Sequence, residues 1–265
     1  MGIRKYINVI VYLFAAIGFI LVVGYFAVKF GWTNVPGIID RQNEYFQQAQ
    51  KAYSWAQGEE WNVFKEAVIR DKEALTKAGM ASDSNPRLIV AQLIVEQLRL
   101  YHTNRELFKT VFAPLKLLGN QSQFSWGVMG LKQETAVEIE NHLKDSTSSF
   151  YLGKKYENLL DFTTTDHNKE RFDRIINEHD RYYSYLYAAL YLKQIETQWK
   201  NAGFDISDRP EILSTLFNIG FKNSHPNHNP QVGGAEIEIK GKTYSFGGLA
   251  SEFYASSELE EAFAK

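Results

Sequence analysis

The sequence predicts a mainly α-helical protein with one small β-hairpin, preceded by a single N-terminal transmembrane helix. Three observations lead to this prediction. Ile7–Val28 contains 22 consecutive residues without a charge, which is long enough for a membrane span. Between residues 40 and 220, apolar residues recur mainly at the spacing of helix faces. Near the C-terminus, Glu236–Ile239 and Thr243–Phe246 flank Lys240-Gly241-Lys242, a pattern typical of a short hairpin.

The composition is that of an ordinary globular protein. The chain has 265 residues, of which 45% are hydrophobic and 23% charged, and its net charge is −2. This is enough for one sizeable domain with an appendage. Because there is no basic excess, we expect no nucleic-acid partner. The absence of cysteine excludes disulfides, thiolate metal sites and a cysteine nucleophile.

The uncharged N-terminal run has the length of a retained membrane anchor. At about 1.5 Å per residue it spans roughly 33 Å, against about 30 Å for the hydrocarbon core of a bilayer. It exceeds the roughly 7–15 apolar residues of a signal peptide, and Val28-Lys29-Phe30 offers no A-x-A cleavage pattern. The alternative is a buried core helix. Because of the length of the run and the missing cleavage pattern, we expect a membrane anchor, with membrane contact through residues 7–28.

Charges on either side of the run set its expected orientation. Arg4 and Lys5 precede it, and the positive-inside rule then keeps the N-terminus in the cytoplasm. Lys29 on the far side makes this bias modest. The predicted organisation is a cytoplasmic tip and anchor over residues 1–32, with everything after it periplasmic or extracellular.

Residues 33–84 are predicted to be helical. Asp40–Ala56 and Glu59–Lys77 have apolar residues on one face, and they are separated near Gly58. Ala78-Gly79 is expected to end the second of these helices. Two alternatives are open: a stalk that holds the main domain away from the membrane, or accessory helices that pack on that domain. The main domain is expected to cover residues 85–265.

A strongly apolar helix is predicted to begin at Asn85-Pro86, since Asn favours the N-cap and Pro the first helical position. Glu96 lies in this helix, one turn from Leu93 and Leu100. A carboxyl among aliphatic side chains loses solvation, which raises its pKa and gives it the protonation state that a general acid needs. The alternative is that Glu96 pairs with Arg99 at the i+3 position on a partly exposed face.

The stretch Phe124–Ala136 has the composition of a loop that lies close to another group. It combines Ser125 with two glycines, Gly127 and Gly130, and a helix is predicted directly after it at Glu134–Lys144. Glycine allows backbone conformations and close approaches that other residues do not. We therefore interpret the stretch as a candidate ligand-facing loop.

Two later segments add candidate site residues. Glu170–Lys200 is predicted as one long helix that holds five tyrosines, including Tyr187. These could either stack on sugar rings in a groove or pack in the core. The helix that starts at Pro210 ends in Phe217-Asn218-Ile219-Gly220, with a glycine suited to a helix stop. His225 and His228 lack the Glu-flanked helical pattern of a metal site, so we expect neither a metal nor a cofactor. A last helix is predicted over Leu249–Phe263.

Three of these pieces, in this order, resemble the lysozyme-like superfamily, in particular the catalytic domain of lytic transglycosylases and goose-type lysozymes. They are the apolar helix with Glu96, the S-x-G-x-x-G-L-x-Q pattern over Ser125–Gln133, and the aromatic-Asn-x-Gly motif at Phe217–Gly220. The resemblance covers about residues 86–220. It departs from the family in two ways: Ser125 follows Glu96 by 29 residues instead of about ten, and Phe217 replaces the usual tyrosine.

The resemblance implies a lysozyme-like α+β fold and binding of the glycan strand of peptidoglycan. Glu96 would protonate the glycosidic oxygen and then act as a base. In lytic transglycosylases the base activates the sugar's own 6-hydroxyl, whereas hydrolysis commonly needs a second carboxylate. We expect a transglycosylase rather than a hydrolytic lysozyme; the alternative is a catalytically inactive glycan-binding or scaffold protein of the cell envelope on the same fold. The residues expected to contact the substrate are Ser125, Gly127, Met129, Gln133, Tyr187, Phe217 and Asn218.

Overall fold

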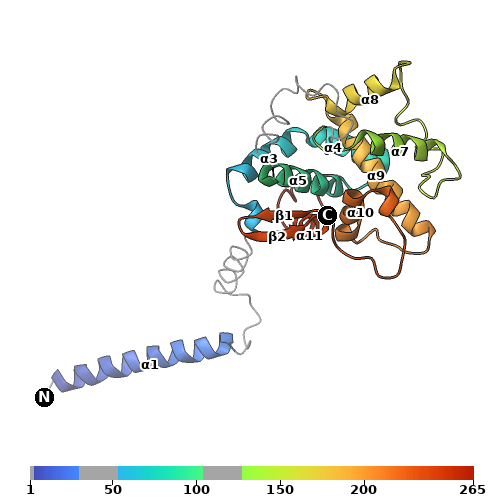
Figure 1. The fold of residues 1–265 in the computed structure, drawn as a ribbon. Helices are drawn as coiled ribbons and strands as arrows, with labels where there is room; N and C mark the ends of the chain where they lie inside the picture. The colour runs from blue at the N-terminus through green and yellow to red at the C-terminus, as the bar shows by residue number, and fades with distance from the viewer. Residues whose placement is uncertain (1–2, 30–52, 104–126) are drawn as a thin grey trace. The chain divides into compact units, whose positions relative to one another are not determined.

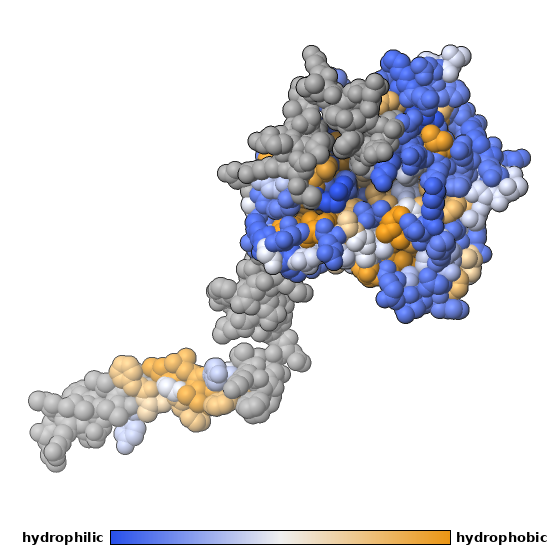
Figure 2. Space-filling view, viewed as in Figure 1, coloured by the Kyte–Doolittle hydropathy of each residue, from blue (hydrophilic) through white to orange (hydrophobic). Residues whose placement is uncertain are grey.

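The computed structural model describes residues 3–29, 53–103 and 127–265 (Figure 1). The chain divides into two compact units, Met1–Tyr53 and Ser54–Lys265. The first contains helix α1, Ile3–Lys29. The large apolar side chains that the structure describes on it are exposed, for example Phe14 by 68% and Phe19 by 70%. Figure 2 shows these hydrophobic side chains in orange on the part of α1 that is not grey. Within the residues that the structure describes, no helix combines the length and hydropathy needed to cross a membrane.

Among its described residues the second unit is mainly helical, with one two-stranded antiparallel hairpin, as the sequence predicted. The predicted bounds differ slightly, because Lys242 belongs to the second strand and Phe246 to the helix that follows. Ile237 pairs with Tyr244, and the two-residue turn at Lys240-Gly241 has positive φ at both positions, the geometry preferred in tight hairpins. The elements are a 3-10 turn Ser54–Ala56, α3 Glu59–Arg70, α4 Lys72–Ser82, α5 Pro86–Thr103, α7 Gln133–Lys144, α8 His167–Ile176, α9 Tyr182–Asn201, α10 Pro210–Ile219, a 3-10 turn Phe221–Asn223, β1 Glu236–Ile239, β2 Lys242–Ser245 and α11 Phe246–Ala255.

Helix α5 lies at the centre of this unit. It contacts α3, α4, α9, α10, α11 and strand β1 (Figure 1), and most of its side chains from Ile89 to Leu98 are buried. Its start follows the predicted capping chemistry, because the Arg87 amide donates to Asn85 Oδ1 at 2.8 Å and Pro86 occupies the first turn. Local signals were therefore sufficient to place the beginning of the central helix.

Residues 54–84 pack within the same unit as residues 85–265. Helix α4 contacts α9 and α5, as expected for accessory helices that pack on the main domain. Residues 33–52, which include most of the predicted helix Asp40–Ala56, lie outside the described residues. The prediction of one helix over Glu59–Lys77 was wrong, because the helix is interrupted at Asp71, between α3 and α4. There, Asp71 Oδ2 accepts hydrogen bonds from Arg181 at 2.7 Å and from the Tyr185 hydroxyl at 2.6 Å.

Gly79 lies inside helix α4, so the prediction that it ends the helix was also wrong. A Cβ atom there would come within 2.7 Å of the Pro86 ring and 2.9 Å of the Ser84 carbonyl oxygen. The glycine allows α4 and the start of α5 to approach closely. The helix ends instead at Asp83, in the left-handed conformation with φ 50°.

The predicted long helix over Glu170–Lys200 is two helices, α8 and α9. Between them the Asn177 side chain accepts hydrogen bonds from the amides of His179 and Asp180, at 2.9 and 3.0 Å. This competes with continuation of the helix. Helix α10, in contrast, ends as predicted at Gly220, with φ 94°.

Helix α11 ends at Ala255, earlier than the predicted Phe263, and Arg87 explains the difference. The Arg87 side chain has no exposed surface. Its five N–H groups all donate to backbone carbonyls that follow or end α11, those of Phe253, Tyr254, Ser256, Glu258 and Phe263, at 2.7–3.0 Å. The helix C-terminus, which lacks intrahelical donors, is thus capped from α5.

We expect Arg87→Met to destabilise the protein strongly. Several buried carbonyls would lose their donors, and each costs about 1–3 kcal/mol, so the free energy of unfolding should fall by at least about 3 kcal/mol. Urea denaturation followed by tryptophan fluorescence measures this, because Trp55 and Trp61 pack on Phe253 at the same end of α11.

Arg70→Met is the matched control for this experiment. The Arg70 side chain is 61% exposed, so its loss should change the free energy of unfolding by no more than about 0.5 kcal/mol. Equal effects of the two substitutions would contradict the structural role assigned to Arg87.

Candidate functional site

Glu96 lies in the C-terminal half of α5 and is buried, with 4% of its surface exposed. Its carboxylate accepts two hydrogen bonds from Arg99, one from Nε to Oε2 at 3.1 Å and one from the terminal guanidinium nitrogen to Oε1 at 2.5 Å. The i+3 pairing considered from the sequence therefore exists, but the carboxyl is buried rather than on a partly exposed face. Arg99 is the more accessible partner, with 29% of its side chain exposed.

Two opposing effects act on the protonation of Glu96. Burial removes water from the carboxyl and raises its pKa above the ordinary value, while the hydrogen bonds and charge of Arg99 lower it; burial is the larger effect, and the pKa is raised. The same ion pair raises the pKa of Arg99. Glu96 thus combines a raised pKa with a partner that stabilises its ionised form, a combination found at acid–base sites.

The turn Gly127–Leu131 covers this carboxyl. Gly127 and Gly130 have φ values of 61° and 62°, and the Gly130 amide donates to the Gly127 carbonyl at 3.3 Å. A Cβ atom at Gly130 would overlap Glu96 Oε1, and one at Gly127 would overlap the carbonyl oxygen of Ile175 at the end of α8. Both glycines are therefore required by conformation and by close approach. The loop predicted from the sequence thus lies close to two other groups: Gly130 lies against the Glu96 carboxyl, and Gly127 against Ile175.

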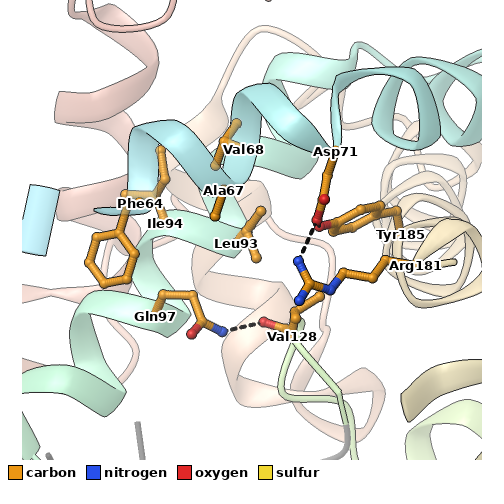
Figure 3. A pocket seen from close by; sticks show the side chains of 10 residues that line it. All are labelled: Phe64, Ala67, Val68, Asp71, Leu93, Ile94, Gln97, Val128, Arg181 and Tyr185. Carbon is orange, nitrogen blue, oxygen red and sulfur yellow. Dashed lines mark hydrogen bonds and ion pairs between the residues drawn. The ribbon is translucent and has the colours of Figure 1, made fainter. Parts of the chain in front are cut away.

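Gln97 attaches the turn to α5. Its side-chain amide donates to the Val128 carbonyl oxygen at 2.5 Å, as Figure 3 shows. A cavity of about 10 Å³ lies beside this bond, where Asp71, Arg181 and Tyr185 approach from the opposite side. It has room for about one water molecule and none for a sugar. Gln97 Oε1, which has no hydrogen-bond partner among the described residues, is the group that such a water would satisfy.

The remaining candidates of the Phe124–Ala136 stretch differ in accessibility. Met129 is 1% exposed, so in this conformation it supports the turn and offers no surface to a ligand. Gln133 is half-buried as the first residue of α7, directly after the turn. Ser125 lies outside the described residues.

Tyr187 occupies the core rather than a groove. It has no exposed surface, and its hydroxyl donates to Glu140 Oε1 at 2.5 Å. Arg171 donates to both oxygens of the same carboxylate, at 2.6 and 2.5 Å. Burial is the first cause that raises the Tyr187 pKa, followed by the Glu140 charge. The prediction that this tyrosine stacks on a sugar is therefore corrected: it joins α9 to α7 and α8.

Phe217 and Asn218 have structural contacts at the end of α10. Phe217 is 8% exposed, and its ring lies 5.0 Å from the Tyr191 ring and 6.4 Å from the Phe246 ring. Asn218 Oδ1 accepts a hydrogen bond from the Ala235 amide at 2.8 Å, just before β1. The structure thus brings Glu96 together with the glycine turn, whereas the recorded contacts of Phe217 and Asn218 are with other parts of the fold.

The sequence reasoning missed Gln97 and Gly130 as members of the site, and it treated Arg99 only as an alternative partner for Glu96. The signal for Gly130 was present, because it is the second glycine of the motif. Gln97 carried no signal of its own, since its role depends on a carbonyl 31 residues away.

The described residues contain no group of three or more His, Asp or Glu side chains that could hold a metal ion. The chain matches no family model, no curated protein and no solved structure.

We expect Glu96→Gln to change how stability depends on pH. A raised folded-state pKa means that the folded protein binds this proton more tightly than the unfolded chain. Its favourable contribution is complete below the ordinary value of 4.5 and is lost as the pH rises through the folded-state pKa. The free energy of unfolding of Glu96→Gln should thus gain on the wild type as the pH rises above 4.5.

Urea denaturation of both proteins at a series of pH values measures this difference. Glu66→Gln, on the exposed side of α3, serves as the comparison, because it removes the same charge from the surface. A wild type that gains stability over Glu96→Gln with rising pH would contradict the assignment.

Proposed function

We propose that this protein is a murein-cleaving enzyme with a lysozyme-like domain, in which Glu96 is the general acid and then the base. The observation that carries the proposal is the contact between the Glu96 carboxyl and Gly130. It joins two of the three pieces that resemble lytic transglycosylases, although 34 residues separate them in the sequence. The mainly helical unit with a short hairpin is consistent with such a fold.

The proposed reaction uses one carboxyl group in two steps. Protonated Glu96 donates its proton to the glycosidic oxygen, and the bond from that oxygen to C1 of the sugar breaks. The carboxylate then accepts the proton of the sugar's own 6-hydroxyl, whose oxygen forms a bond to C1 and gives an anhydro product. Burial favours the first step by keeping the proton on Glu96 at higher pH. Gln133, at the entrance to α7, is the proposed sugar contact from the glycine-containing stretch.

The surroundings of Glu96 favour transglycosylation over hydrolysis. A hydrolytic route commonly uses a second carboxylate, whereas among the described residues the Glu96 carboxyl meets Arg99 and Gly130. Two carboxylates later in the chain have local structural roles. Asp145 accepts hydrogen bonds from Thr147, and Asp166 caps α8.

Incubating the full chain with purified peptidoglycan, and analysing the products by mass spectrometry, tests the function. We expect soluble anhydromuropeptides from the wild type, and a loss of at least about a hundredfold in Glu96→Gln, in line with the usual contribution of a general acid. Glu66→Gln controls for the loss of a surface carboxylate and should keep its activity. Hydrolytic products, which carry one more water, would instead identify a lysozyme.

The absence of soluble products from the wild type, or equal products from Glu96→Gln, would overturn the catalytic assignment. The second candidate function, a glycan-binding or scaffold protein on the same fold, would then be favoured. Two observations support this candidate: Phe217 lacks the hydroxyl of the family's tyrosine, and Arg99 occupies both oxygens of Glu96. Binding to insoluble peptidoglycan without cleavage distinguishes it.

We also propose that residues 7–28 anchor the protein in the cell membrane, with the N-terminus cytoplasmic and residues 33–265 periplasmic or extracellular. The run of 22 residues without a charge supports this, and an outward-facing domain would meet the peptidoglycan. Expressed in bacteria, the full chain should stay in the membrane fraction after an alkaline carbonate wash and dissolve only with detergent. Replacing Ile17 and Leu21 by Lys should release it to the soluble fraction, because charges at the centre of a span are costly; wild-type protein that is washed off would contradict the anchor.

A further inference from the structure

We propose that Arg99 is a positioning residue for this reaction: its guanidinium holds the Glu96 carboxyl against the Gly127–Leu131 turn. This inference rests on the proposed function. It assigns to Arg99 a role in setting the pH range over which Glu96 can donate a proton.

The contact geometry limits the carboxyl to one orientation. Arg99 meets both oxygens, through Nε at 3.1 Å and through a terminal nitrogen at 2.5 Å. Planar two-point recognition of a carboxylate is specific to arginine, since lysine presents a single point charge. Gly130 closes the side of Oε1, where even a Cβ atom would not fit. The carboxyl is thus held between a fork of donors and a glycine backbone.

Arg99 is the charged group that acts on Glu96 in the described part of the chain. The turn that covers the carboxyl consists of Gly, Val, Met, Gly and Leu and contributes no titratable side chain. On the far side of Gln97, Asp71 is paired with Arg181 and Tyr185. The electrostatic balance at Glu96 is therefore between burial and one guanidinium.

The difference in exposure between the partners fits a working role. Glu96 has 6% of its side chain exposed and Arg99 has 29%, so Arg99 is the partner that solvent reaches more easily. After Glu96 has given its proton to the leaving oxygen, the same two hydrogen bonds hold the new carboxylate in place to accept the proton of the 6-hydroxyl. Without Arg99, burial would act alone, and the carboxyl would hold its proton to higher pH.

Two variants of the full chain in detergent test the role of Arg99. Arg99→Gln removes the charge, and Arg99→Lys keeps the charge but loses the two-point contact. Lys193→Gln is the matched control, because Lys193 pairs with Glu196 at the same i+3 spacing on α9, at 3.3 Å. The first measurement is an infrared titration of the carboxyl stretch without substrate, with the Glu96 band assigned by its absence in Glu96→Gln. The second is the pH dependence of anhydromuropeptide release.

We expect Arg99→Gln to raise the Glu96 titration midpoint by about 1–3 pH units, the usual effect of losing an adjacent opposite charge. The loss of activity at high pH should move upward by the same amount, because this limb reports the acid that must be protonated. Arg99→Lys should give a smaller shift, and Lys193→Gln none. A merely structural role would lower stability without moving either midpoint.

The possible outcomes separate this inference from the proposed function. An active wild type with unchanged midpoints in Arg99→Gln overturns the role of Arg99 and leaves the function standing. An inactive wild type overturns the function; the titration without substrate then still decides whether Arg99 controls the protonation of Glu96. If Arg99→Gln does not fold, the shift in Arg99→Lys decides, and its absence overturns the inference.

Discussion

The hydrogen bonds of the Arg87 side chain are the interaction on which the second unit, Ser54–Lys265, depends. Five N–H groups on one planar side chain meet the carbonyls at and beyond the C-terminus of α11, so a single residue fixes the last part of the chain on the central helix. Arg87 is the second residue of α5, and Glu96 follows nine residues later, about 13.5 Å along the same helix. Because α5 is rigid and buried, anchoring its N-terminus also fixes the direction from which the Glu96 carboxyl approaches the glycine turn. Arg87 forms no ion pair with a carboxylate of the described residues, and its burial is tolerated because every N–H donor is satisfied.

Polar ties play a similar role on α9. The sequence shows a row of tyrosines, and the structure uses the hydroxyls of two of them as links between helices: Tyr185 bonds to Asp71 at the break between α3 and α4, and Tyr187 bonds to Glu140 on α7. Each hydroxyl joins a largely buried arginine–carboxylate pair, with Arg181 in the first and Arg171 in the second. Such pairs stabilise a fold only when the remaining hydrogen-bonding positions are filled. The hydroxyls of Tyr185 and Tyr187 fill these positions, which explains why two large polar side chains lie on the buried face of α9.

At Glu96 the same physical rules lead to a different result. The carboxyl has an arginine partner, yet its pKa is raised, because the turn of small and apolar residues removes it from water. Burial by a glycine backbone brings the covering atoms closer than any side chain would allow. The result is a carboxyl that is held in one orientation and whose pKa is raised above the ordinary value. This is the condition that proton donation and subsequent proton acceptance by one group require.

The sequence by itself determined the helical class, the hairpin, the start of α5 at Asn85-Pro86 and the end of α10 at Gly220, because these depend on neighbouring residues alone. It also identified Glu96 and the glycine stretch as candidates, but it could not show that they meet. Tertiary structure decided the break at Asp71, the early end of α11 and the burial of Tyr187, since each depends on a partner far away in the chain. The same is true of Glu96: Arg99, three residues away, was visible in the sequence, but only the fold brings Gly130 onto the carboxyl. That contact helps to bury the carboxyl, while Arg99 stays partly exposed.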